Sequence, residues 1–257
     1  MTDWRKAYAY INVDDPLVAW LVYRAEMVSA GELHASALSF WSARMLRSRK
    51  QYTQELILDQ VRQSSYASAA SRLKGFYLFP TEASARAAAT RWDGGAFHSD
   101  FLAEVAINPR SRVSQYDAEW ITQDFPASDS WIHAYFSGQA TAAPVWELIV
   151  EGRALILGTD LRERAYATVK ETWPQSLAVL ELARLAVEVG SDLGVITAML
   201  FDRGEQLVVD YVVRFDNDNP EFIEGMKNFR GEVNTQDLYA GENLVIPDLQ
   251  NRRFVIS

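Results

Sequence analysis

The 257-residue sequence predicts an α+β fold, in which short apolar strands and helices follow one another without regular alternation. Three observations support this prediction. The segment AYAYINV over 7–13 has the period-two pattern of a strand, with Tyr8 and Tyr10 on one face. Asp14-Asp15-Pro16 then supplies a helix cap followed by a first-turn proline. Later, two apolar segments rich in β-branched residues are joined by the turn-like sequence 202–205, which is a strong hairpin signal.

The remaining elements are read from periodicity and from the residues that break it. We expect helices over about 16–29, 36–63, 80–92, 129–136, 161–173, 175–189 and 220–229. We expect strands over 7–13, 75–79, 101–107, 113–121, 195–201, 206–215, 244–246 and 253–256, and a strand pair over 144–157 that bends at Glu151-Gly152. The second helix is expected to bury a stripe made of Phe40, Trp41, Leu46, Leu56, Ile57 and Val61. A change of pattern near residue 160 divides the chain into a core, 1–160, and a C-terminal helix-plus-hairpin extension, 161–257.

Composition excludes several classes of protein. Hydrophobic residues make up 49% and charged residues 23%, which is typical of a globular protein. The absence of cysteine rules out disulfides, thiolate metal sites and cysteine nucleophiles. We expect a cytoplasmic protein, because the N-terminus lacks a secretory pattern and no apolar run approaches the roughly 18 residues of a membrane span. The net charge of -9 argues against broad electrostatic attraction to nucleic acid or anionic lipid.

Common catalytic and cofactor motifs are missing. No glycine-rich phosphate loop follows a strand and opens a helix, and no G-x-S-x-G elbow is present. The three histidines are widely spaced without an HExxH arrangement, so we expect no metal site. A basic cluster of Arg44, Arg47, Arg49 and Lys50 has two interpretations, a solvated helix face or contact with a phosphate-bearing partner.

One ordered set of residues does carry chemistry. Ser71-Arg72 precedes the strand GFYLF, which contains Tyr77, and an Ala-rich helix follows. Tyr135 precedes a turn at Gly138, and Glu147 lies on the strand that comes next. This order resembles bacterial members of the ADP-ribosyltransferase superfamily over about residues 7–157.

The resemblance implies a split β-sheet core flanked by helices, with NAD as the substrate and no metal. Glu147 matches the catalytic glutamate, and Ser71, Arg72, Tyr77 and Tyr135 match positions around the NAD. Tyr10, with Asn12 two residues later, occupies the first-strand position where the family usually has His or Arg, which is a departure. The implied activity is mono-ADP-ribosylation of a macromolecular acceptor, nucleic acid or protein, by a toxin or phage-defence effector with an antitoxin as a further partner.

The chemistry explains why so few residues are required. Nicotinamide leaves NAD as a neutral group, so no general acid is needed. The remaining difficulty is the oxocarbenium-like ribose, which one carboxylate can stabilise. An aromatic ring can pack against the cationic nicotinamide, and Arg72 is the candidate for the pyrophosphate.

Other interpretations stay open at this point. Glu147 can face solvent by simple strand alternation, although Trp146 and Leu148 place apolar groups on the opposite face as well. Ser71-Arg72 can be a loop cap, and Tyr10 can be a core aromatic. Two alternative functions follow: an NAD glycohydrolase that sends water to the ribose, and a non-catalytic binding module that uses the C-terminal hairpin.

Overall fold

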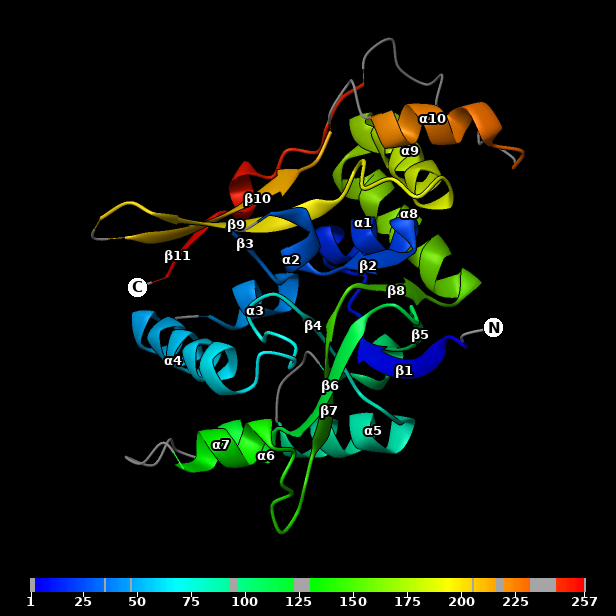
Figure 1. The fold of residues 1–257 in the computed structure, drawn as a ribbon. Coiled ribbons are helices and arrows are strands. Elements are labelled where there is room, and N and C mark those ends of the chain that lie inside the picture. The colour runs from blue at the N-terminus through cyan, green and yellow to red at the C-terminus, as the bar shows by residue number, and fades with distance from the viewer. Residues whose placement is uncertain are drawn as a thin grey trace.

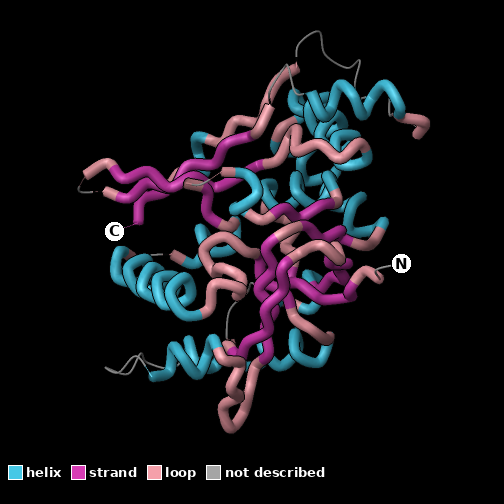
Figure 2. The backbone as a smooth tube through the Cα atoms, in the orientation of Figure 1, coloured by secondary structure: helices cyan, strands magenta, loops and turns pink. Residues whose placement is uncertain are grey.

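A computed structural model describes residues 3–34, 36–46, 48–92, 97–122, 130–204, 206–215, 220–231 and 244–256. Over these residues the fold is α+β, with ten α-helices and three antiparallel sheets (Figures 1 and 2). The helices are α1 (Pro16–Arg24), α2 (Ala30–Leu33), α3 (Phe40–Met45), α4 (Arg49–Ser65), α5 (Glu82–Arg91), α6 (Glu119–Thr122), α7 (Ser130–Phe136), α8 (Thr159–Thr172), α9 (Leu177–Glu188) and α10 (Pro220–Asn228). None of the described helices is long and apolar enough to cross a membrane.

The first sheet contains β1 (Arg5–Tyr10), β5 (Leu102–Ile107), β8 (Arg153–Ile156) and β2 (Glu26–Val28). Its strand order is β1-β5-β8-β2, and every neighbouring pair is antiparallel. Alternate residues of β5, Ala103, Val105 and Ile107, are buried, as the period-two pattern predicts. One face of this sheet therefore supplies part of the main core.

The second sheet carries Glu147 and is joined to the first at two points. It contains β4 (Phe76–Leu78), β7 (Trp146–Glu151) and β6 (Arg112–Asp117), in the order β4-β7-β6. β7 continues into β8 through Gly152, whose φ of +136° allows the bend that the sequence predicts at Glu151-Gly152. Tyr8 of β1 and Phe79 after β4 exchange two backbone hydrogen bonds of 2.9 and 2.7 Å.

The third sheet links the N-terminal and C-terminal parts of the chain. It contains β11 (Phe254–Ile256), β10 (Leu207–Val213), β9 (Ile196–Asp202) and β3 (Ala37–Leu38), in that order. Figure 1 shows the β9–β10 hairpin with α8 and α9 in the upper part of the molecule, and β6 and β7 with α5, α6 and α7 in the lower part.

Helix α1 lies at the centre of the shared core, packed against α8 and α9. Its Trp20 is fully buried, donates a 2.8 Å hydrogen bond from Nε1 to the carbonyl of Gly194, and meets the ring of Trp173 edge-on. One hydrophobic cluster contains residues from both sides of position 160. The expected boundary near residue 160 thus falls between two parts of the chain that share a core.

Two of the helix predictions are wrong in extent. The first helix ends at Arg24 rather than near Ser29, because Ala25 adopts a left-handed φ of +69° and donates its N–H to Leu21. The chain then enters β2 instead of continuing as a helix to about residue 29.

The helix predicted over 36–63 is three elements, β3, α3 and α4. Its interruption follows from two serine caps: the hydroxyl of Ser39 accepts the N–H of Ser42, and that of Ser48 accepts the N–H of Gln51. Each cap starts a new helix and changes which residues face inward.

The rephasing of α4 changes which of its apolar side chains are buried. Leu58 is buried at 1% exposure, whereas Leu56 and Ile57, expected in the buried stripe, are 43% and 45% exposed.

Two strand predictions also need correction. The strand expected over 113–121 ends at Asp117, whose carboxylate accepts the N–H groups of Glu119, Thr141 and Val145 and turns the chain into α6. Residues 244–246 form no strand, and each of them is at least 38% exposed. Three expected features lie outside the described residues: Arg47 of the basic cluster, Asp129 at a helix start and Glu205 in the hairpin turn.

Candidate functional site

A cavity of about 490 Å³ lies between the ends of β1 and β4, helix α3 and the segment that follows β6. Ligand pockets typically have volumes of about 300–1,000 Å³, so this one has room for a small molecule. Among the described lining residues the charged side chains are Arg44, Arg72 and Glu147, and Glu147 is the sole carboxylate. The rest of the lining is mostly aromatic and aliphatic.

Glu147 is buried in the wall of this cavity. It is 5% exposed, while its neighbour Leu148 on the opposite face of β7 is 0% exposed. The solvent-facing interpretation of Glu147 is therefore wrong. Oε1 accepts a 2.8 Å hydrogen bond from Arg72 Nη1 and a 2.9 Å hydrogen bond from the Tyr135 hydroxyl. Oε2 accepts no hydrogen bond from the part of the chain that the structure describes.

Burial controls the protonation of this carboxyl group. Removal from water raises the pKa of Glu147, while the Arg72 guanidinium and the Tyr135 hydroxyl act in the opposite direction, and the net direction is upward. A carboxyl group that lines a cavity and has one oxygen without a hydrogen bond from the described residues is suited to contact a hydroxyl or a positive charge on a ligand.

Arg72 is surrounded by acceptors and aromatic rings. Its Nη1 contacts Glu147 and, at 2.9 Å, the hydroxyl of Tyr135. Its Nε lies 3.2 Å from Oε2 of Glu55, and Nη2 lies 3.3 Å from Oε1 of the same carboxylate. The guanidinium also lies over the ring of Tyr77, 5.0 Å from its centroid. Arg72 is only 4% exposed, so its donors are committed within the protein.

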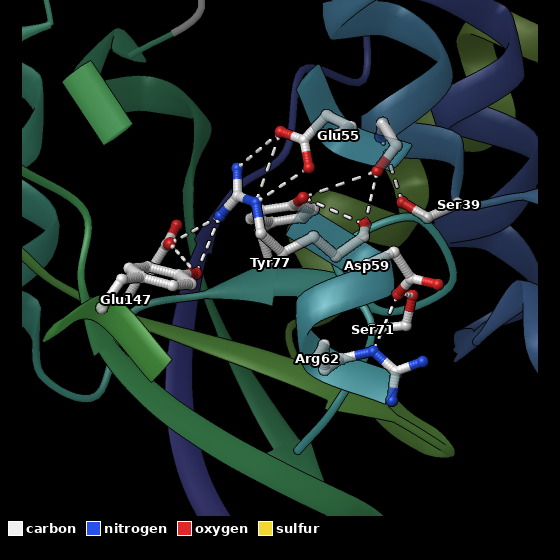
Figure 3. Close-up of polar contacts among 10 residues, drawn as sticks. Ser39, Glu55, Asp59, Arg62, Ser71, Tyr77 and Glu147 are labelled. Atoms are coloured by element: carbon white, nitrogen blue, oxygen red, sulfur yellow. Dashed lines mark hydrogen bonds and ion pairs between the residues drawn. The ribbon is translucent and has the colours of Figure 1, made fainter. Parts of the chain in front are cut away.

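Ser71 holds the loop before β4 to helix α4 (Figure 3). Its hydroxyl donates a 2.7 Å hydrogen bond to Oδ1 of Asp59, which also accepts from Arg62. The N–H of Ser71 donates to Glu151 at 3.1 Å. Ser71 does not line the cavity. Its contacts are those of a residue that positions the backbone of Arg72.

Tyr10, Asn12 and Tyr77, three other residues predicted from the sequence, line the cavity. The Tyr10 hydroxyl donates to the carbonyl of Ala85 at 3.1 Å, and its ring forms part of the wall. Asn12 uses Oδ1 to accept the N–H of Asp14 at 2.9 Å.

The rings of Tyr77 and Tyr135 both lie close to the guanidinium of Arg72, 5.0 and 5.6 Å from it. The Tyr77 hydroxyl donates to the carbonyl of Arg72 at 3.0 Å. Tyr135 is fully buried on α7, outside the cavity lining, and reaches Glu147 through its hydroxyl alone.

Sequence reasoning did not identify several residues of the wall. Trp41, Trp92 and Phe97 form a series of ring contacts: Trp41 meets Tyr77 at 6.1 Å and Phe97 at 6.5 Å, and Phe97 meets Trp92 at 5.7 Å. Trp41 was expected only as a core residue, although tryptophan on a capped helix next to a basic cluster is a usable signal.

Arg44 belongs to the predicted basic cluster and lines the cavity. It contacts Asp15 at 2.6 Å, and its side chain is 39% exposed. Glu55, the second acidic partner of Arg72, has no distinguishing signal in the sequence.

Comparison of the chain with protein-family models, with curated protein sequences and with solved structures finds no match. The function must therefore be argued from the site itself.

Proposed function

We propose that this chain is an NAD-dependent mono-ADP-ribosyltransferase and that Glu147 is its catalytic residue. The environment of the Glu147 carboxylate carries the proposal. One oxygen is held by Arg72 and Tyr135, and the residue lines a cavity whose other described walls hold no second carboxylate. A single carboxylate beside a mostly apolar cavity is what cleavage of a cationic N-glycosidic bond requires.

The reaction has a simple balance. The bond between ribose C1′ and the nicotinamide nitrogen breaks, and its electron pair stays on that nitrogen, so the pyridinium becomes a neutral leaving group. A lone pair of the acceptor forms the new bond to C1′, and the acceptor releases its proton to solvent. Glu147 accepts a hydrogen bond from a ribose hydroxyl and faces the positive charge that develops on the sugar.

The aromatic wall supplies a place for the nicotinamide ring. Tyr10, Trp41, Tyr77, Trp92 and Phe97 all line the cavity. A cation over an aromatic face gains about 0.5–2 kcal/mol, and this gain is lost when the ring becomes neutral. The wall thus favours the cationic substrate over the neutral product.

Binding of the NAD pyrophosphate requires a cationic side chain with donors that can reach the cavity. The sequence suggested Arg72, but the contacts of Arg72 with Glu55 and Glu147 occupy its guanidinium. Arg44 is the better candidate, since it lines the cavity, is partly exposed and pairs with one carboxylate, Asp15, among the described residues. A guanidinium binds phosphate oxygens through two parallel N–H donors.

The arrangement of the first and second sheets supports a split-sheet core of the ADP-ribosyltransferase kind. The first and second sheets meet at Gly152 and at the bridge between Tyr8 and Phe79, and helices lie around them (Figure 1). Glu147 stands near the start of β7, where this strand borders the cavity.

The acceptor is proposed to be a macromolecule. Val145 stands two residues before Glu147, so the E-x-E pattern of arginine-modifying relatives is missing. Nucleic acid, or a protein group other than arginine, is the acceptor class that follows. A toxin or phage-defence effector controlled by an antitoxin is the biological setting proposed for such a reaction.

The test uses NAD labelled in the adenylate phosphate, incubated with the purified chain and with separated protein, RNA and DNA fractions. We expect label in one fraction, and a loss of about 10²–10³-fold in Glu147→Gln, the range seen when a group that stabilises transition-state charge is removed. The Gln side chain keeps the volume of Glu and can still accept from Arg72. Nicotinamide release without label in any fraction would assign water as the acceptor. Equal labelling by the wild type and the variant would overturn the proposal.

A further inference from the structure

Arg72 forms ion pairs with two carboxylates that come from distant parts of the chain. Glu147 lies on β7, and Glu55 lies on helix α4 (Figure 3). Glu55 takes the edge of the guanidinium formed by Nε and Nη2, with N–O distances of 3.2 and 3.3 Å. Nη1 is the donor that contacts Glu147 and Tyr135.

Polar contacts and apolar packing together fix helix α4 relative to this loop. Leu58 is the buried residue of α4, and Asp59 bonds both Ser71 and Arg62. The carbonyl of Arg72 accepts the hydroxyl of Ser42 at 2.6 Å. The backbone of Arg72 is therefore held independently, and Glu55 determines the direction of its side chain.

This direction decides how Arg72 meets Glu147. Guanidinium and carboxylate groups favour a bidentate pair, in which two N–H donors take both oxygens. A bidentate pair with Glu147 would draw Oε2 away from the cavity. Glu55 fixes the edge formed by Nε and Nη2, and in this orientation Nη1 alone contacts Glu147, at Oε1.

We propose that Glu55 is a positioning residue: it holds Arg72 in a one-donor contact with Glu147 and so keeps Oε2 of Glu147 available to the ligand. The catalytic part of this inference rests on the proposed function. Glu55 itself does not line the cavity and is not expected to touch NAD.

The ionisable groups that face Glu147 make the proposal measurable. They are Arg72 from the loop, Glu55 from α4, Tyr77 from β4, Tyr116 from β6 and Tyr135 from α7. Of these, the charge of Glu55 acts to raise the pKa of Glu147, whereas Arg72 acts to lower it. Replacing Glu55 with Gln removes the charge and frees the guanidinium edge for Glu147, and both changes lower the pKa of Glu147.

The experiment follows the carboxyl carbon of Glu147 by NMR in the full chain labelled with ¹³C-glutamate. The resonance is identified as the one that Glu147→Gln lacks. In Glu55→Gln we expect its titration to move to lower pH. Asp59→Asn removes the charge of the other acid of α4 and keeps an oxygen that can accept from Ser71. It is the matched control and should leave the titration in place even if it lowers stability. Glu55→Asp keeps the charge and should stay closer to the wild type.

Activity supplies the second readout. In Glu55→Gln we expect kcat for nicotinamide release to fall about tenfold, the scale of effect when a residue that orients a functional side chain is replaced. We expect KM for NAD to stay unchanged. In an Arg72→Lys background the same change should have no further effect, because lysine offers no bidentate edge.

Each outcome decides the proposal. Equal Glu147 titration in Glu55→Gln and wild type, in folded proteins, overturns it, as does an undiminished effect of the change in the Arg72→Lys background. If the wild type cleaves no NAD, the proposed function fails, and an unchanged NMR titration in Glu55→Gln would still overturn the role of Glu55 by itself.

Discussion

Replacing Arg72 with methionine tests the charge cluster around Glu147 most severely. The change keeps a long side chain but removes the guanidinium that contacts Glu147 at 2.8 Å. The exposed fractions of the two side chains are 5% and 7%, so water replaces little of the lost contact. Glu147 would be left as a buried charge with the Tyr135 hydroxyl as its remaining donor.

The size of the effect follows from this burial. Removing one partner of a buried ion pair costs about 3–5 kcal/mol, against about 0–1 kcal/mol for an exposed pair. Glu55 adds less to the loss, because its side chain is 17% exposed and regains some hydration. For a chain of this size each kcal/mol lowers Tm by about 2–4 °C. The expected fall in Tm is thus roughly 6–20 °C.

The loss of folding stability in Arg72→Met should also depend on pH, in a direction that the pKa of Glu147 determines. The pKa of Glu147 is already raised in the folded chain, and removal of Arg72 raises it further. The folded state then holds a proton that the unfolded state releases, so stability falls as pH rises from the unfolded pKa, about 4.3, through the folded one. Arg72→Met should therefore be less impaired near pH 5 than near pH 8.

Urea unfolding followed by tryptophan fluorescence measures these differences. The control is a triple variant, Arg72→Met with Glu147→Leu and Tyr135→Phe, which replaces the buried charges and the hydroxyl between them by apolar groups. Such replacements are often neutral, so the triple variant should recover most of the lost stability. A single variant within about 1 kcal/mol of the wild type at pH 8, or a triple variant no more stable than the single one, would refute the reasoning.

Three further predictions use other parts of the structure. Tyr135→Phe removes a hydroxyl that lowers the pKa of Glu147, so the acid limb of the pH–kcat profile should move to higher pH, and an unmoved limb contradicts the role of this contact. Arg44→Ala should raise KM for NAD about tenfold or more, because a charged hydrogen bond is worth about 1.5–3 kcal/mol; isothermal titration that finds unchanged NAD affinity would exclude Arg44 from the site. Gly152→Ala should lower the free energy of unfolding by more than about 1 kcal/mol, because φ is +136° and the new Cβ would come 2.3 Å from Oγ of Ser111. Urea unfolding measures this change, and a midpoint equal to that of the wild type would show that a side chain does not strain the bend.

Local patterns predicted the elements whose limits are set by nearby residues. The bend at Gly152 and the cap at Asp15 both follow from short sequence signals. The left-handed Ala25 has no such signal, because its conformation serves the pairing of β2 with β8, far along the chain. The same reason explains the shortened first helix.

The candidate site shows a similar division. The sequence predicts one functional set, made of Tyr10, Asn12, Ser71, Arg72, Tyr77, Tyr135 and Glu147. The structure brings all of them except Ser71 and Tyr135 to the lining of one cavity. Pattern alone did not decide whether Glu147 faces solvent, because alternation along a strand does not say what covers each face.

The contact between Arg72 and Glu55 of α4 could not be predicted from the sequence for a related reason. Glu55 lies on a helix whose phase was misjudged, since the break before Ser48 moved the buried side from Leu56 and Ile57 to Leu58. An error of one residue in the phase rotates the predicted helix by about 100°. The prediction then does not show that Glu55 is on the face of α4 that meets the loop before β4.

The central claim is that the Glu147 carboxylate promotes loss of nicotinamide from NAD bound in the cavity. Release of nicotinamide labelled in its ring, measured for the purified wild type and for Glu147→Gln at equal folded concentration, tests this claim most directly. We expect release by the wild type and a rate lower by about two to three orders of magnitude in the variant. Release at the same rate by both proteins, or by neither although NAD binds, would contradict the claim.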